Sequence, residues 1–168
     1  MFEQPFFMVP APASPIDCDA VTGRLTVATA CYLCWASGAA VVAIVRNMPA
    51  AFGGLSTGLS VTNDFLIGFG TALSPPLWWM LVQAFFAARA ARSVEATRAT
   101  IGALTAFGAM ECIGALGEPV TLQALAPATF DPLLAVTQLG MVLLPLAIVI
   151  FGVRAWREAE GRTAAPPM

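Results

Sequence analysis

The chain alternates long apolar stretches with short polar connections. Four of these stretches are each about as long as a helix needs, at 1.5 Å per residue, to cross a hydrocarbon core about 30 Å thick. They cover residues 25–45, 65–88, 99–116 and 133–153. The pattern predicts an all-α fold, an integral membrane four-helix bundle over residues 24–157. A mobile tail is expected at residues 1–23 and a second tail at residues 158–168.

Arginine, the only basic residue type in the chain, is distributed unevenly around these stretches. Seven of the eight arginines flank the termini or the connection between the second and third stretches, and only Arg46 lies on the opposite side. By the positive-inside rule, both termini are expected in the cytoplasm, and the loops at residues 46–64 and 117–132 are expected outside. The predicted location is the cytoplasmic membrane of a bacterium, as a multi-pass protein.

Composition excludes several classes of protein. Hydrophobic residues make up 58% of the chain and charged residues 11%, whereas a soluble domain carries about 25% charged residues. The net charge of −2 gives no basis for a nucleic-acid partner. The absence of histidine excludes imidazole catalysis and histidine-ligated zinc or haem. No cofactor or metal is expected, and the expected partners are the lipid bilayer, further copies of the chain or a larger membrane complex, and a small apolar ligand.

Two acidic residues stand out near the end of the third stretch. Glu111 lies inside it, where a carboxylate costs about 2–3 kcal/mol unless it is paired, protonated or hydrated. Glu118 follows seven residues later, on the same helix face. Asp131 and Gln138 repeat this spacing on the fourth stretch, so a hydrogen bond between Glu111 and Gln138 is expected.

This polar group has two interpretations. In the first, Glu111 and Gln138 lock two helices together, and the remaining charges are interfacial. In the second, the group forms one wall of a pocket that opens outward. The candidate ligand-binding residues of such a pocket are Glu111, Glu118, Gln138, Asp64, Arg46, Thr71 and Trp78.

The second stretch contains Ser74-Pro75-Pro76 near its midpoint. Each proline removes a backbone donor and clashes with the preceding turn, so the helix must kink or open. Asp64, Thr71 and Trp78 fall seven residues apart and are expected on one face. The segment is either a static kink filled by aromatic packing or a bent helix that lines a cavity.

Small residues favour close helix packing in the third stretch, where Gly102, Ala106, Met110 and Gly114 fall four apart. Because helix association in lipid depends on close approach, this stretch is expected to be the central helix. A large side chain at Gly108 or Gly114 is expected to lower thermal stability.

Cys31 and Cys34 form a CxxC motif in the first stretch. The motif resembles that of the four-helix membrane thiol oxidoreductases that form disulfides and reduce quinone. In that family the motif lies at the outer end of a helix, whereas the arginine distribution places it here in the cytoplasmic half. Buried thiols are inert, and the two cysteines are expected to serve as packing residues. A redox role is kept as a minor alternative.

Three functional classes remain open. The favoured one is a non-enzymatic membrane protein, either an accessory subunit or a binder of a small apolar or lipid-like molecule. The second is a small membrane enzyme that uses Glu111 and Glu118 for acid–base chemistry on a lipophilic substrate. The third is a proton-coupled transporter.

Overall fold

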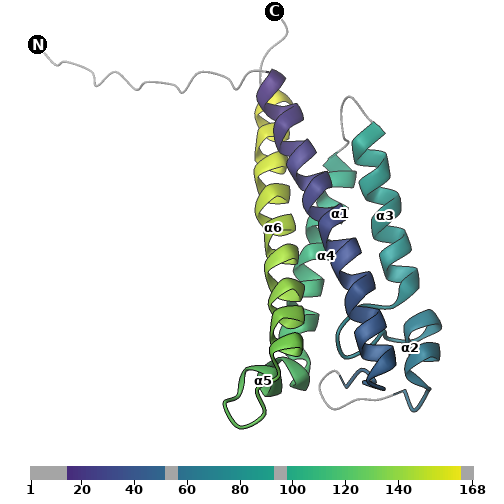
Figure 1. Ribbon diagram of the computed structural model, residues 1–168. Coiled ribbons are helices and arrows are strands. Elements are labelled where there is room, and N and C mark those ends of the chain that lie inside the picture. The colour runs from purple at the N-terminus through teal and green to yellow at the C-terminus, as the bar shows by residue number, and fades with distance from the viewer. Residues whose placement is uncertain (1–14, 52–56, 93–97, 164–168) are drawn as a thin grey trace, which may run out of the picture.

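The computed structural model describes residues 15–51, 57–92 and 98–163, and the secondary-structure elements of these residues are all helices. The prediction of an all-α fold is therefore confirmed. The six helices, shown in Figure 1, are α1 (Pro15–Val45), α2 (Val61–Ile67), α3 (Leu77–Arg92), α4 (Arg98–Gly117), α5 (Pro119–Leu125) and α6 (Pro132–Thr163).

Three helices are long and apolar enough to cross a membrane, judged by length and composition. The candidate spans are Ala20–Val45 in α1, Arg98–Gly117 in α4 and Pro132–Gly161 in α6. They correspond to the first, third and fourth apolar stretches of the sequence.

Two of these helices are longer than expected. Helix α1 starts at Pro15 and α6 continues to Thr163, so both extend into segments predicted to be tails. The outer parts of the expected tails, residues 1–14 and 164–168, lie outside the described residues.

The second apolar stretch is not one helix, contrary to the prediction of a span at residues 65–88. Helices α2 and α3 are separated by residues 68–76, which are not helical. The consecutive prolines Pro75 and Pro76 lack backbone donors and disfavour helix before them, but they are compatible with the start of α3. Gly70 has a φ of 101°, and a Cβ there would lie 2.5 Å from the carbonyl oxygen of Ser74. This turn therefore requires glycine.

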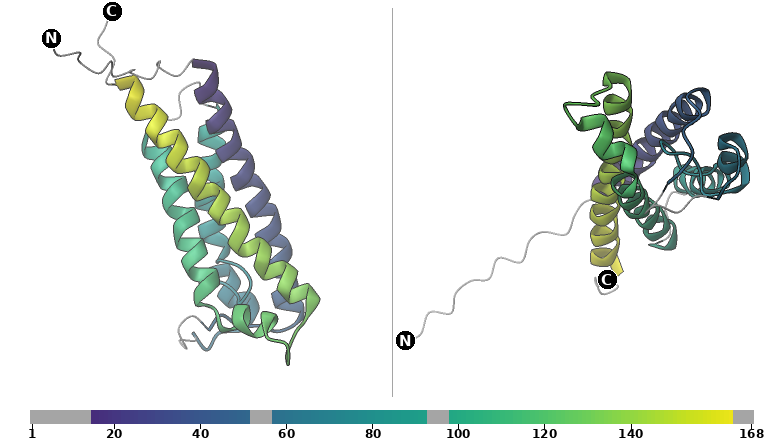
Figure 2. Two further views of the ribbon diagram at one scale, coloured as in Figure 1. Left: turned by 90° about the vertical axis from the view of Figure 1, so that its left-hand side faces the viewer. Right: turned by 90° about the horizontal axis from the view of Figure 1, so that it is seen from below.

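Helices α1, α3, α4 and α6 lie alongside one another (Figures 1 and 2). Helix α6 packs extensively against both α1 and α4, and α3 packs less extensively against the same two helices. The expectation that the third stretch forms the central helix is therefore wrong, because α6 has the more extensive contacts. The short helices α2 and α5 lie at the end opposite to the start of α1 and the end of α6.

Glycines allow the close helix crossings, although not at all the expected positions. A Cβ added to Gly108 would lie 2.9 Å from Cγ2 of Ile148 and 3.0 Å from the carbonyl oxygen of Pro145. A Cβ at Gly114 would meet nothing within 4 Å. Gly140 lies against the Trp35 indole, whose Nε1 donates to the carbonyl oxygen of Thr137 at 3.0 Å. The prediction of close packing holds at Gly108 and is wrong at Gly114.

These contacts predict different outcomes for two alanine substitutions in α4. Gly108→Ala should destabilise the protein by about 1–3 kcal/mol, because the added methyl group must displace α6. Gly114→Ala should leave stability unchanged or raise it slightly through the better helix propensity of alanine. Thermal unfolding in mild detergent measures both effects. Equal melting temperatures for the two variants would contradict this assignment of the α4–α6 contact.

Candidate functional site

A cavity of about 500 Å³ lies near the end of the molecule that carries α2 and α5. Its walls come from α1, from residues 68–76, and from α3, α4 and α6. Five of the seven residues predicted from the sequence line this cavity. They are Thr71, Trp78, Glu111, Glu118 and Gln138.

The cavity reaches the molecular surface on an apolar side. Phe69 of the 68–76 segment is 74% exposed, Trp78 at the start of α3 is 48% exposed, and Met110 of α4 is 56% exposed. All three side chains line the cavity. Its opening is therefore bordered by apolar and aromatic groups from the α3 and α4 sides.

Glu111 is the most buried carboxyl of the lining, with hydrogen-bond donors from α3. Nε1 of Trp79 donates to its Oε1 at 3.1 Å, and Nε2 of Gln83 donates to its Oε2 at 3.2 Å. The expected bond between Glu111 and Gln138 is not formed, because Gln138 is engaged elsewhere. Gln83 was not recognised from the sequence. The available signal was its position four residues after Trp79, which places both side chains on one helix face.

Two buried polar atoms near Glu111 have no hydrogen-bond partner among the described residues. They are the hydroxyl oxygen of Tyr32 and Oε1 of Gln83, and both side chains are 0% exposed. Tyr32 lines the cavity from α1 and interacts electrostatically with Glu111. Tyr32, which stands between the two cysteines of the CxxC motif, was also not recognised from the sequence.

The non-helical segment at residues 68–76 is held by hydrogen bonds to its own side chains and to neighbouring elements. Oγ1 of Thr71 accepts from the backbone N–H groups of Leu73 and Ser74 at 3.2 and 3.0 Å. The N–H of Ala72 donates to the carbonyl oxygen of Met48 at 3.3 Å, and its carbonyl accepts from Nε2 of Gln138 at 3.2 Å. Gln138 thus satisfies a carbonyl that the helix break leaves free.

Asp64 does not line the cavity and has a structural role instead. Its carboxyl is fully buried, and it accepts from Oγ1 of Thr57 at 2.8 Å and from the N–H of Phe69 at 3.2 Å. Since the helix breaks after α2, the expected common face of Asp64, Thr71 and Trp78 does not exist. Trp78 instead donates from Nε1 to the carbonyl oxygen of Gly68 at 3.3 Å.

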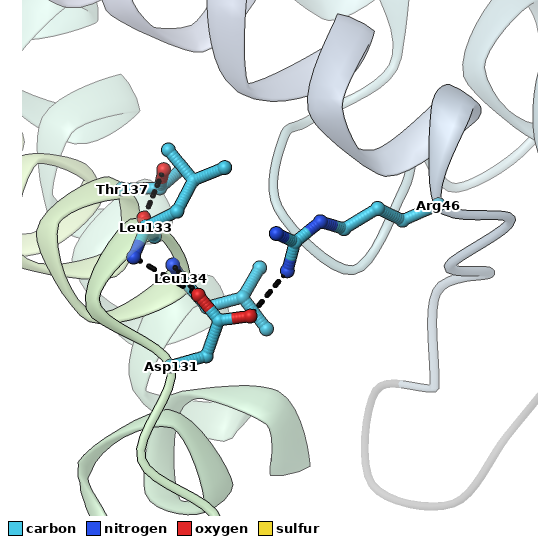
Figure 3. A network of polar contacts seen from close by, with 5 residues as sticks. All are labelled: Arg46, Asp131, Leu133, Leu134 and Thr137. Carbon is cyan, nitrogen blue, oxygen red and sulfur yellow. Dashed lines mark hydrogen bonds and ion pairs between the residues drawn. The ribbon is translucent and has the colours of Figure 1, made fainter.

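Arg46 also lies outside the cavity lining, and it pairs with Asp131 (Figure 3). Asp131 additionally accepts from the N–H groups of Leu133 and Leu134 and so caps the start of α6. The hydrogen bond from Arg46 lowers the pKa of Asp131. This exposed ion pair joins the end of α1 to the start of α6.

Cys31 and Cys34 carry free thiols on the exposed face of α1. The expectation that they are buried packing residues is therefore wrong. Neither residue lines the cavity.

Comparison of the chain with protein-family models, with curated proteins and with solved structures finds no match. Among the described residues, no group of three or more histidine, cysteine, aspartate or glutamate side chains could hold a metal ion. The acid–base role expected for Glu111 and Glu118 stays a prediction.

Glu118 forms the start of α5, at the edge of the cavity. Burial raises the pKa of its carboxyl, and the hydrogen bond from the N–H of Ala51, 3.2 Å from Oε2, opposes this shift. Between the unfolded and the folded pKa, the folded protein therefore retains a proton that the unfolded chain has lost. The free energy of unfolding should fall as the pH rises through this window.

The variant Glu118→Gln tests this pH dependence. Glutamine carries no charge and can still accept from Ala51, so the variant should lose this decline and become more stable than wild type above the window. Glu118→Ala, which leaves the Ala51 donor without its acceptor, is the contrasting variant and should be destabilised at every pH. Melting temperatures in detergent from acidic to neutral pH measure both effects. A Glu118→Gln protein less stable than wild type at neutral pH would refute the assignment.

Proposed function

We propose that this protein is a non-enzymatic membrane protein that binds a small apolar or lipid-like molecule in the cavity lined by Glu111 and Trp78. The observation that carries this proposal is the cavity itself, about 500 Å³ in volume. Ligand sites typically measure about 300–1,000 Å³ and are mostly apolar, with a few polar groups that orient the ligand. The lining fits this description, because aromatic and aliphatic side chains surround two carboxyls and one amide.

The proposed membrane arrangement has four crossings. Helices α1, α4 and α6 would each cross as one helix, and the fourth crossing would be the broken segment of α2, residues 68–76 and α3. Seven arginines belong to the end of the molecule where α1 begins and α6 ends. The positive-inside rule favours the cytoplasm for that end and for both termini, in a bacterial inner membrane. The cavity would then lie in the outer half of the bilayer, with its apolar opening toward lipid.

Three polar residues predicted for the pocket make contacts that hold segments of the fold together. Asp64 stabilises the end of α2, Arg46 pairs with Asp131, and Gln138 satisfies the carbonyl of Ala72. Glu111 accepts hydrogen bonds from two donors of α3, and it also lines the cavity. Helix packing therefore explains the polar contacts around the cavity and at the helix break. It does not explain the cavity itself, which ligand binding would explain.

A cavity-filling substitution tests the binding proposal. Gly114 lines the cavity and a Cβ there meets nothing within 4 Å, so Gly114→Phe should place a ring in the cavity. Gly38 is the matched control, because it is an exposed glycine of α1 whose Cβ would also meet nothing within 4 Å. The probe is 1-bromo-4-isobutylbenzene, whose bromine quenches tryptophan fluorescence on contact. Saturable quenching in nanodiscs separates binding to a site from partition into lipid.

The expected result is saturable quenching in wild type and Gly38→Phe, and a loss of affinity of at least about tenfold in Gly114→Phe. Native mass spectrometry should also find fewer co-purifying lipids or apolar molecules on Gly114→Phe. Non-saturable quenching in all three proteins, together with a wild type free of co-purifying molecules, would refute the proposal.

Transport of the same ligand is the second candidate function, and the helix break at residues 68–76 favours it. Discontinuous helices line substrate sites in many transporters, where a freed backbone must face protein or a cavity. If the segment moves during transport, wild type in proteoliposomes should speed the passage of a bound probe across the bilayer, and Gly114→Phe should abolish this effect. Saturable binding without such an effect would leave binding as the function.

A further inference from the structure

We propose that the ligand of this cavity carries a positive charge, as a lipophilic ammonium compound whose nitrogen binds beside Glu111. This inference rests on the proposed binding function and specifies the chemical class of the ligand. It stands on the charges of the lining, on the unpartnered oxygen atoms around Glu111 and on the aromatic wall.

The charges of the lining have one sign. Glu111 and Glu118 both line the cavity, whereas no arginine is among the described lining residues. Arg46, the basic residue at the same end of the molecule, pairs with Asp131 outside the cavity. An anionic ligand would find no basic partner in the described lining, whereas a cationic ligand could pair with a carboxylate there.

The hydrogen-bonding groups around Glu111 favour a ligand that donates. An ionised carboxylate has about four acceptor sites, and Glu111 receives one donor on each oxygen, from Trp79 and Gln83. Oε1 of Gln83, which can only accept, is buried without a partner behind Glu111, although Gln83 itself is not among the lining residues. The hydroxyl of Tyr32 is 0% exposed and lines the cavity, and it has no partner in hydrogen-bonding geometry, although it interacts electrostatically with Glu111. The Tyr32 oxygen and the remaining acceptor sites of Glu111 can therefore accept from an ammonium group, which only donates.

Aromatic side chains complete the match to a lipophilic cation. The N–H edge of the Trp79 indole donates to Oε1 of Glu111, so this ring holds the carboxyl in place at the cavity. Trp79 packs edge-on against Phe107, with ring centroids 4.6 Å apart, and this contact helps to fix its orientation. Trp78 and Phe69 at the opening offer apolar contacts to the remainder of the ligand.

The test compares a cation with a neutral compound of the same shape. The cationic probe is N,N-dimethyl-4-bromobenzylamine, which is protonated at neutral pH, and its neutral isostere is 1-bromo-4-isobutylbenzene. Wild type in phosphatidylglycerol nanodiscs should bind the cation at least about tenfold more tightly than the isostere by saturable tryptophan quenching. Glu111→Gln should lose this preference and keep its affinity for the isostere. Asp131→Asn removes a carboxylate outside the cavity and should keep the preference.

A second variant keeps the test decisive if Glu111→Gln does not fold. Tyr32→Phe removes only the unpartnered hydroxyl, so it should weaken binding of the cation several-fold and leave binding of the isostere unchanged. Equal affinities for the two probes in wild type, with no effect of either variant, would overturn the inference and leave the binding function in place. Absence of saturable binding for both probes would instead refute the binding function.

The source of the ammonium group is either a free lipophilic amine or the headgroup of an aminolipid. Two bilayers of equal surface charge separate these sources: one third of the phosphatidylglycerol is replaced either by phosphatidylethanolamine or by phosphatidylcholine, whose quaternary nitrogen has no N–H to donate. An ethanolamine headgroup that occupies the site should raise the apparent dissociation constant of the cationic probe in the first bilayer relative to the second. A free amine as the ligand should give the same constant in both. Binding of the cation that is weaker than binding of the isostere in both bilayers would overturn the inference.

Discussion

The arrangement of this protein depends on satisfying the backbone hydrogen bonds of residues 68–76. Two consecutive prolines prevent a continuous helix there, and a buried, unpaired peptide group costs several kcal/mol in an apolar environment. The hydroxyl of Thr71 therefore accepts from the N–H of Leu73. The carbonyl of Met48 accepts from the N–H of Ala72, and Gln138 donates to the Ala72 carbonyl. These bonds join the segment to the end of α1 and to α6. They place it as a fixed wall of the cavity.

The break also sets the register of α3, and through it the environment of Glu111. Helix α3 starts at Leu77, directly after the prolines, so Trp79 and Gln83 fall on the face that meets α4. Their donors stabilise a buried carboxyl that would otherwise lack hydrogen-bond partners. The two buried glutamines therefore have different roles. Gln138 satisfies a backbone carbonyl at the helix break, and Gln83 donates to Glu111 at the candidate site.

The helices around the cavity are held by close contacts that leave the cavity itself open. Gly108 brings α4 against α6 at Ile148, and Gly140 of α6 accommodates the indole of Trp35 from α1. The ion pair of Arg46 and Asp131 ties the end of α1 to the start of α6. Six residues beyond Gly108, and therefore on a different face of α4, Gly114 faces the open space of the cavity instead of a neighbouring helix. One helix thus combines a packing glycine with a glycine at a candidate site.

The sequence was enough to predict the helical class, three of the four apolar stretches as single long helices and the position of the break in the other, because hydropathy and proline act locally along the chain. It also determined that Glu111 is the exceptional residue, since a carboxyl within an apolar stretch requires partners. The identity of these partners depends on how the helices pack. Glu111 is bonded to Trp79 and Gln83 rather than to Gln138, because the prolines split the second stretch and gave Gln138 a free carbonyl to satisfy. Seven-residue spacing within one helix could not reveal this, since it does not show which neighbouring helix supplies the partner.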